Sequence, residues 1–112
     1  MGNKEDVLGN LILELRRGTI VLSVLSQLSD SKYGYSLVQS LEEKGVTVEA
    51  NTLYPLLRRL ETQGLLESKW DTDEARPRKY YVLSAFGHDV YKRLCDEWRS
   101  MVDGLGKLID KE

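Results

Sequence analysis

Residues 49–67, "EANTLYPLLRRLETQGLLE", bring an asparagine and two adjacent arginines into one short segment. In contacts with nucleic acids, arginine bridges O6 and N7 of guanine, asparagine pairs with adenine, and threonine or tyrosine bonds phosphate or meets a thymine methyl group. The segment therefore supplies five candidate contacts: Asn51, Thr52, Tyr54, Arg58 and Arg59. The alternative interpretation is an ordinary solvated surface on which the arginines pair with Glu61 or neighbouring acids.

A second basic cluster follows at Arg76, Arg78 and Lys79, directly before Tyr80 and Tyr81. Such a cluster suits phosphate contacts or entry into a minor groove, and we expect Arg78 and Lys79 to contact phosphates. Part of the charge will be neutralised by acids of the same loop: Asp71, Asp73 and Glu74.

Four tyrosines accompany these clusters. Tyr80 and Tyr81 point to opposite faces if the segment is a strand, so we expect one in the core and the other exposed. Tyr33 and Tyr35 flank Gly34, and we expect one of them to pack in the core while the other reaches a phosphate. The sequence does not choose between them.

Side chains for catalysis or metal binding are sparse. His88 is the only histidine and Cys95 the only cysteine, which gives neither metal-ligand spacing nor a nucleophile–base pair. We interpret them as a helix-surface histidine and a buried thiol. No phosphate-binding glycine loop or paired-carboxylate motif occurs either. The sequence thus predicts no enzyme, no metal site and no cofactor.

The elements that would position these clusters follow from hydrophobic periodicity. Helical spacing covers residues 3–18, 19–28 and 33–45, and a further helix begins at 49–51 and ends at Gly64. That helix turns its leucines to the core and carries Pro55 in its first turns, where proline is tolerated. The period then changes to two at 65–70 and 78–83, around a loop at 71–77. This order predicts a mainly α fold with a small β-hairpin, the winged helix-turn-helix plan.

A last helix is predicted from the N-cap Ser84 to about residue 110. One face carries apolar residues at heptad spacing, as in coiled coils: Tyr91, Leu94, Trp98, Met101, Leu105 and Leu108. A helix of this length spans roughly 40 Å, more than a compact domain of this size covers, so we expect part of the seam to contact a partner chain. Alternatively the seam folds back on the N-terminal helix, or that helix packs across the dimer. We expect residues 1–83 to form the DNA-binding domain with its N-terminal helix and 84–112 the dimerisation helix, together one compact unit.

Composition limits where the chain can act. The chain has 112 residues and a net charge of −2, so it is not basic overall. Any surface that binds nucleic acid must therefore be a local basic patch. A single cysteine fits a reducing compartment, and neither a signal peptide nor a membrane-spanning run is apparent. We therefore expect a cytoplasmic protein without a membrane partner.

Several motifs resemble the PadR family of bacterial transcriptional regulators. They are "YGYSL" at 33–37, "NTLYPLLRRLETQGLLES" at 51–68 and "RPRKYYVLSAFG" at 76–87, and the single helix after the wing looks like the short subfamily. The resemblance implies a homodimeric repressor of its own operon or of a neighbouring transport or membrane-protein gene. Two-fold symmetry implies an inverted-repeat operator in double-stranded DNA. The rival is a winged-helix module that binds a protein and not DNA. Two departures are Asn51, where the family often has glycine, and "DEAR" at the wing tip in place of a glycine-rich loop.

The resemblance also implies a role for Trp98 beyond packing. In some short relatives the matching tryptophans of two subunits line a central cavity and stack on flat aromatic compounds, and the family's effectors include phenolic acids and cationic drugs. The residues implied for a small aromatic effector are Trp98, Met101 and Val102. Plain packing at the dimer seam is the alternative.

Overall fold

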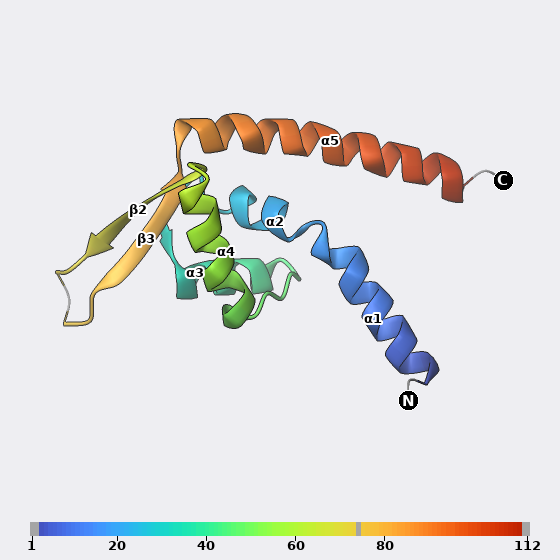
Figure 1. Ribbon diagram of the computed structural model, residues 1–112, viewed down its shortest axis with the longest axis horizontal. Coiled ribbons are helices and arrows are strands. Elements are labelled where there is room, and N and C mark those ends of the chain that lie inside the picture. The colour runs from blue at the N-terminus through green and yellow to red at the C-terminus, as the bar shows by residue number, and fades with distance from the viewer. Residues whose placement is uncertain (1–2, 74, 111–112) are drawn as a thin grey trace.

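A computed structural model describes residues 3–73 and 75–110 of the chain (Figure 1). The helices it places are α1 (Lys4–Arg17), α2 (Ile20–Ser26), α3 (Gly34–Glu43), α4 (Ala50–Thr62) and α5 (Ala85–Ile109), and the strands are β1 (Lys32–Tyr33), β2 (Leu66–Asp71) and β3 (Arg78–Leu83). This confirms a mainly helical fold with a small sheet. None of these helices combines the length and the hydropathy that a membrane span requires within the described residues.

Local signals in the sequence set most helix ends. The Asn3 side chain accepts from the backbone N–H of Asp6 and forms a capping box at the start of α1. Ser84 caps α5 by accepting from the N–H of Gly87. The chain leaves α4 through Gly64, whose φ of 82° is in the left-handed region that favours glycine.

Pro55 lies inside α4, and the helix continues through it. Since proline has no N–H, the carbonyl of Asn51 four residues earlier lacks its usual intrahelical donor. Asn51 is exposed at the start of the helix, so water can satisfy that carbonyl. This is why a proline in the second turn does not break α4.

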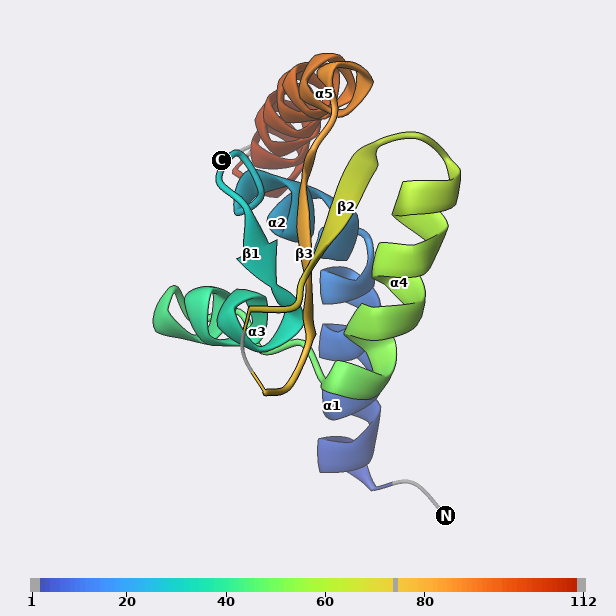
Figure 2. The ribbon, with the colours of Figure 1, turned by 90° about the vertical axis from the view of Figure 1, so that its left-hand side faces the viewer.

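The sheet has three antiparallel strands in the order β1–β3–β2. Strands β2 and β3 form the predicted hairpin, with Trp70 opposite Lys79 and Asp71 opposite Arg78. The third strand was not predicted: Lys32 and Tyr33 of β1 pair with Tyr81 and Tyr80 of β3. Two residues are too few for an alternating pattern to show in the sequence. Figure 2 shows β1 leading into α3, the hairpin (the wing) beside it, and α4 on the other side.

The hydrophobic core lies where α2, α3 and α4 meet the base of the sheet. Its buried residues are Val24, Leu25, Leu28, Leu37, Leu41, Val48, Leu53, Leu57, Leu60, Leu65, Leu66, Tyr81 and Leu83. Of the four leucines expected to face the core from α4, Leu56 is only half-buried. The core therefore belongs to residues 24–83, and α1 contributes no buried residue to it.

Helices α1 and α5 extend away from this core (Figure 1). The start of α5 packs on the core through Val90, Tyr91 and Leu94, and the rest of the helix runs past it. The radius of gyration is 16.7 Å, against about 13 Å for a compact chain of this length. The described chain is thus more extended than a compact chain of its length, because two helices project from it. The division at residue 83 stays a prediction.

Candidate nucleic-acid interface

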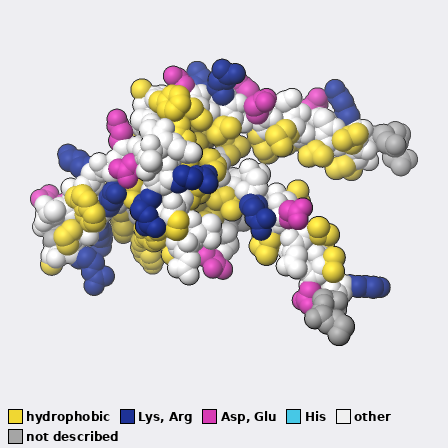
Figure 3. Space-filling view, viewed as in Figure 1, with side chains coloured by type: hydrophobic (Ala, Val, Ile, Leu, Met, Phe, Trp, Pro, Cys, Tyr) yellow, Lys and Arg dark blue, Asp and Glu magenta, His cyan; other side chains and the backbone are white. Residues whose placement is uncertain are grey.

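Helix α4 buries one face and leaves the other open. Leu53, Leu57 and Leu60 are buried, while the candidate contacts Asn51, Thr52, Arg58 and Arg59 are exposed. Neither arginine forms an ion pair with any acid within residues 3–73 and 75–110. Their guanidinium groups therefore keep their donors for an external partner. Figure 3 shows Lys and Arg side chains on this side of the molecule, over α4 and the wing.

A shallow hollow extends this surface toward the junction of α1 and α2. Thr52 and Arg59 line it from α4, and Arg17 lines it from the end of α1. Arg17 is the last residue of α1. Its position beside Arg59 adds a cation to the exposed surface of α4 that spacing along the chain could not reveal.

Tyr54 is partly used for packing between helices. Its ring covers Gly34 at the start of α3, where an added Cβ would overlap the ring carbon Cε1. The ring is nevertheless 41% exposed. Tyr54 therefore joins α4 to α3 and also reaches the surface, and its close packing on α3 requires glycine at position 34.

Glu61, near the end of α4, joins the helix to both strands of the wing. Its Oε1 lies 3.2 Å from the Lys79 ammonium on β3, and its Oε2 accepts a hydrogen bond from Ser68 on β2. The Ser68 hydrogen bond first, and then Lys79, hold the pKa of the Glu61 carboxyl below its ordinary value, although desolvation opposes them. Hydrogen bonding to Glu61 in turn raises the pKa of Lys79.

Lys79 is consequently less available to phosphate than the sequence suggests. Besides its ion pair, its Nζ lies 5.3 Å from the centre of the Tyr81 ring. The sequence suggested Glu61 as a partner of the arginines of α4, whereas the structure pairs it with a lysine 18 residues away. Such a long-range pair leaves no periodic signal.

Arg78 and two tyrosines form a cluster on the opposite face of the wing. The guanidinium carbon of Arg78 lies 4.5 Å from the centre of the Tyr33 ring, which meets the Tyr80 ring edge-to-face at 5.5 Å. Tyr81 occupies the core, as expected for one of the pair, but Tyr80 is half-buried instead of exposed. Arg76 is exposed beside the wing tip.

The prediction that Tyr33 or Tyr35 packs in the core was wrong. Tyr33 is half-buried in the wing cluster, and Tyr35 is 59% exposed. The β1–β3 pairing explains the difference, since it draws Tyr33 to the outer face of the sheet beside Tyr80. Tyr35 is left on the surface at the start of α3.

The predicted seam of α5 divides into two parts. Tyr91 and Leu94 pack on this chain's own core, beside α2. Farther along, the exposed fractions are 45% for Trp98, 63% for Met101 and 70% for Leu108, and Leu105 is exposed as well. The alternative in which the seam folds back on α1 does not hold within one chain, because α1 buries none of its residues. Figure 3 shows the apolar side chains along the inner side of α5.

Trp98 borders a hollow of about 430 Å³ between α2 and α5. The hollow is lined by Thr19, Leu22, Ser23, Ser26, Tyr91, Cys95, Trp98 and Arg99. Met101 and Val102, which were expected to line a ligand site with Trp98, do not reach it. Cys95 is half-buried here rather than buried, and a hydrogen bond with its side chain raises the pKa of Tyr91, with burial as the second cause. His88 is exposed, as interpreted.

Comparisons with known proteins give consistent results. The family described as "Transcriptional regulator PadR-like family" matches residues 21–93. Transcriptional regulator Rv3488 of Mycobacterium tuberculosis is 38% identical over 75 residues, which are 66% of this chain and 70% of that protein. A PadR family transcriptional regulator from Eggerthella lenta has 50% identity and a TM-score of 0.91 over 96% of both chains. A transcriptional regulator from Clostridium thermocellum has 29% identity and a TM-score of 0.75, over 88% of this chain and 96% of that one. These relatives are regulators, not enzymes.

Proposed function

Because this chain belongs to the PadR-like family of transcriptional regulators, we propose that it binds double-stranded operator DNA as a homodimer and represses transcription. The observation that carries the proposal is the exposed face of α4, where Arg58 and Arg59 have no intramolecular ion pair among the described residues. A helix with such a face fits the major groove, where arginine and asparagine discriminate base pairs. The gene regulated is its own operon or a neighbouring transport or membrane-protein gene.

The two surfaces have different roles in this proposal. Asn51, Thr52, Arg58 and Arg59 contact base edges or adjacent phosphates from α4, with Tyr54 at the margin. Arg76 contacts phosphate from the wing, and Arg78 and Lys79 do so from positions where they already have partners inside the molecule. Phosphate contacts position the protein, whereas base contacts specify the sequence.

A second copy of the chain is the partner that fits the projecting helices. Helix α1 exposes an apolar set (Val7, Leu8, Leu11, Ile12, Leu13 and Leu15) and α5 exposes another (Trp98, Met101, Val102, Leu105, Leu108 and Ile109). An isolated helix of 14 residues is marginal in water, so α1 needs a surface to cover it. Pairing α1 and the end of α5 with the same helices of a second copy buries both sets and gives the two-fold symmetry that an inverted repeat requires.

The last part of the proposal is an effector. Two copies of Trp98 near a two-fold axis would form walls for one planar aromatic molecule, with Met101 and Val102 one turn further along as a soft lining. Titration with flat cationic dyes and phenolic acids would quench Trp98 fluorescence, in Trp70→Phe to remove the second emitter. If the quenching persists in Trp98→Ala, or if no compound quenches the fluorescence, the proposed effector site is rejected. The proposed role as a regulator would be unaffected.

A mobility shift with the DNA upstream of its own gene tests the function. We expect a sequence-selective, salt-sensitive shift that Arg58→Ala with Arg59→Ala abolishes. Glu42→Ala with Glu43→Ala, on the exposed end of α3, is the matched control and keeps the shift. If no ligand condition gave a selective shift, the winged-helix module that binds a protein would be the better interpretation.

A further inference from the structure

Trp70 is a large aromatic residue in the wing that the proposed contacts leave unused. It is the fifth of the six residues of β2, and its side chain is 59% exposed. Alternation along the strand places it on the same face as Leu66 and Ser68. Ser68 bonds Glu61 on α4, so this is the face that looks toward α4.

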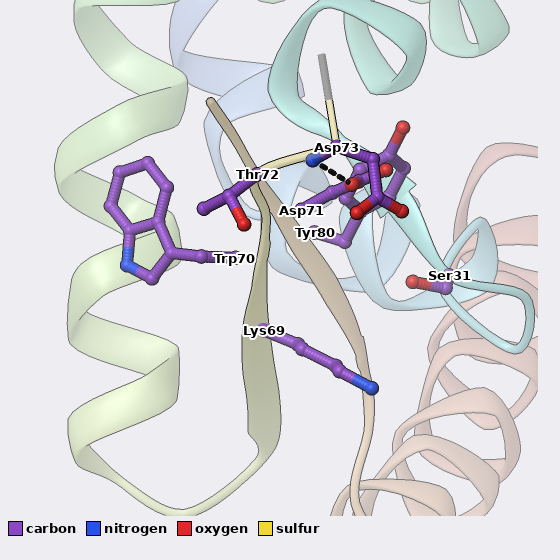
Figure 4. A pocket seen from close by; sticks show the side chains of 7 residues that line it. All are labelled: Ser31, Lys69, Trp70, Asp71, Thr72, Asp73 and Tyr80. Carbon is purple, nitrogen blue, oxygen red and sulfur yellow. Dashed lines mark hydrogen bonds between the residues drawn. The ribbon is translucent and has the colours of Figure 1, made fainter. Parts of the chain in front are cut away.

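Figure 4 shows how the side chains around Trp70 diverge. The indole points to the side of β2 on which α4 lies, whereas Lys69, Asp71 and Tyr80 point to the other side. Those residues and Trp70 are among the seven that line a polar hollow, in which the Asp73 N–H donates to Asp71 Oδ1 over 3.0 Å. Trp70 thus borders this hollow, but its indole points away from Lys69, Asp71 and Tyr80 and toward α4.

The polar neighbours of Trp70 on this face already have partners. Lys79, directly opposite it on β3, pairs with Glu61, and Ser68 donates to the same carboxylate. These bonds fix the angle of the wing relative to α4. The indole remains exposed on this face. An indole buries about 150–250 Å² when covered, so its exposure is a substantial unused source of apolar contact.

We propose that Trp70 packs its indole against the sugar–phosphate backbone of the bound DNA. This inference rests on the proposed function. With α4 in a major groove and the wing tip at the adjacent minor groove, one backbone strand runs through the space between them, and Trp70 faces it. The ring contacts deoxyribose carbons, and Nε1–H, the only polar group of the indole, donates to a phosphate oxygen. The contact is independent of sequence.

The salt dependence of DNA affinity distinguishes the loss of an uncharged contact from the loss of a basic residue. Replacing Arg76 removes a cation, so fewer counterions are released on binding and the salt dependence of the affinity falls. Replacing Trp70 removes an apolar contact and one hydrogen bond but no charge. Affinity should therefore fall for all sequences while the salt slope stays the same.

The first experiment compares the operator affinities of Trp70→Ala, Trp70→Phe and Arg76→Ala with wild type across a salt series. We expect Trp70→Ala to bind about tenfold more weakly at every salt concentration, by analogy with aromatic stacking on nucleotides. Trp70→Phe keeps a ring but no donor and should lie between it and wild type. Wild-type affinity in Trp70→Ala, or a reduced salt slope, would overturn the inference. A melting temperature close to wild type, expected for an exposed side chain, excludes an effect through folding.

The second experiment follows the indole itself. In Trp98→Phe, Trp70 is the sole tryptophan, and we expect its emission to shift to the blue or be quenched when operator DNA is added. If Trp98→Phe does not fold, the difference between the spectra of wild type and Trp70→Phe gives the same signal. Unchanged emission of a complex that demonstrably binds DNA would overturn the inference, as would a shift that depends on protein concentration without DNA. Failure of wild type to bind any DNA would instead overturn the proposed function.

Discussion

The middle of this chain and its two terminal helices differ in how they are stabilised. Residues 24–83 enclose a core in which Leu25, Leu53 and Leu57 are fully buried. Helix α1 and the second half of α5 have equally regular backbone structure but bury almost nothing. The difference shows that helical periodicity reports an apolar face without reporting what covers it. In the middle region the apolar faces pack against other parts of the same chain. At the two ends we propose that they pack against a second copy.

The strongest test of this comparison separates the two regions by mutation. Leu105→Asp with Leu108→Asp puts two carboxylates in the proposed interface at positions that are exposed in the single chain. Burying unpaired carboxylates costs several kcal/mol, so we expect a monomer whose middle region remains folded. Light scattering gives the mass, and circular dichroism the retained helix.

The control is Lys92→Asp with Arg93→Asp, which also introduces two carboxylates, here at exposed charged positions of α5 and with a larger change of net charge. We expect it to remain a dimer. A folded dimer in the leucine variant would mean that the second copy binds elsewhere. Leu94 is a poorer site for this experiment than the sequence suggested, since it also packs on the chain's own core.

The second test compares the two surfaces of the middle region that we propose to contact DNA. Arg58→Ala should cost about 1–3 kcal/mol for its base contact and relax the preference at particular positions. Arg76→Ala should weaken binding to all sequences and lower the salt slope by about one unit for each phosphate that a subunit no longer neutralises. Quantitative mobility shifts with operator and scrambled DNA measure both effects.

Lys79→Ala extends that test, because the Lys79 ammonium of the wild-type protein already pairs with Glu61. We expect a smaller change of the salt slope than for Arg76→Ala. An equal change would show that Glu61 releases Lys79 when DNA binds. A wing variant that altered sequence preference while Arg58→Ala did not would reverse the assignment of the two surfaces.

A third test uses one glycine from each region. A Cβ at Gly34 would overlap the Tyr54 ring, whereas one at Gly9 in α1 meets nothing within 4 Å. Because the half-exposed ring can swing aside, we expect Gly34→Ala to cost about 1 kcal/mol, the low end for overpacking. Gly9→Ala should stabilise α1 by up to about 1 kcal/mol through helix propensity. Thermal unfolding measures both.

Tyr54→Ala supplies the control for this pair. In its background Gly34→Ala should lose most of its cost, because the atoms that clash are gone. An unchanged cost would place the strain in the backbone of α3 instead of the Tyr54 ring.

The smallest expected effect is a pH dependence of the wing. The fold lowers the pKa of Glu61, chiefly through Ser68. The resulting stabilisation is present above the ordinary glutamate pKa of about 4.3 and is lost as pH falls toward the lowered value. Glu61→Gln should therefore be less stable than wild type near neutrality and lose less of its stability as the pH falls below the ordinary glutamate pKa. Because the pair is partly exposed, we expect less than about 1 kcal/mol. Melting temperatures are measured for both proteins across this pH range. A difference between them that does not change with pH would contradict this expectation.

Local signals explain how much of the fold the sequence predicts. The ends of α4 follow from leucine spacing and Gly64, and the start of α5 follows from Ser84, because each signal acts within a few residues. Strand β1 was missed because two residues carry no period, and it is defined by β3, which lies almost 50 residues later in the chain.

The candidate site divides in the same way. The exposed arc of α4 follows from the helical wheel, since burial of one face fixes the other. Pairing of Glu61 with Lys79, Tyr54 over Gly34 and the direction of Trp70 toward α4 are set by how elements meet in space. The seam of α5 was predicted as one surface, yet Tyr91 packs on the chain's own core whereas Leu108 is exposed.

The absence of any buried residue in α1 has a consequence for the cell. If a second copy covers the terminal helices, as we propose, the stability of the protein depends on its own abundance. Freshly made chains at low copy number would carry exposed, marginal helices that proteases can cleave, and pairing would remove that vulnerability. In the proposed dimeric regulator, operator occupancy would follow the concentration of dimers and would rise with the square of the chain concentration while monomers predominate. A gene that such a protein controls would respond steeply to a modest change in protein level, without any additional signal.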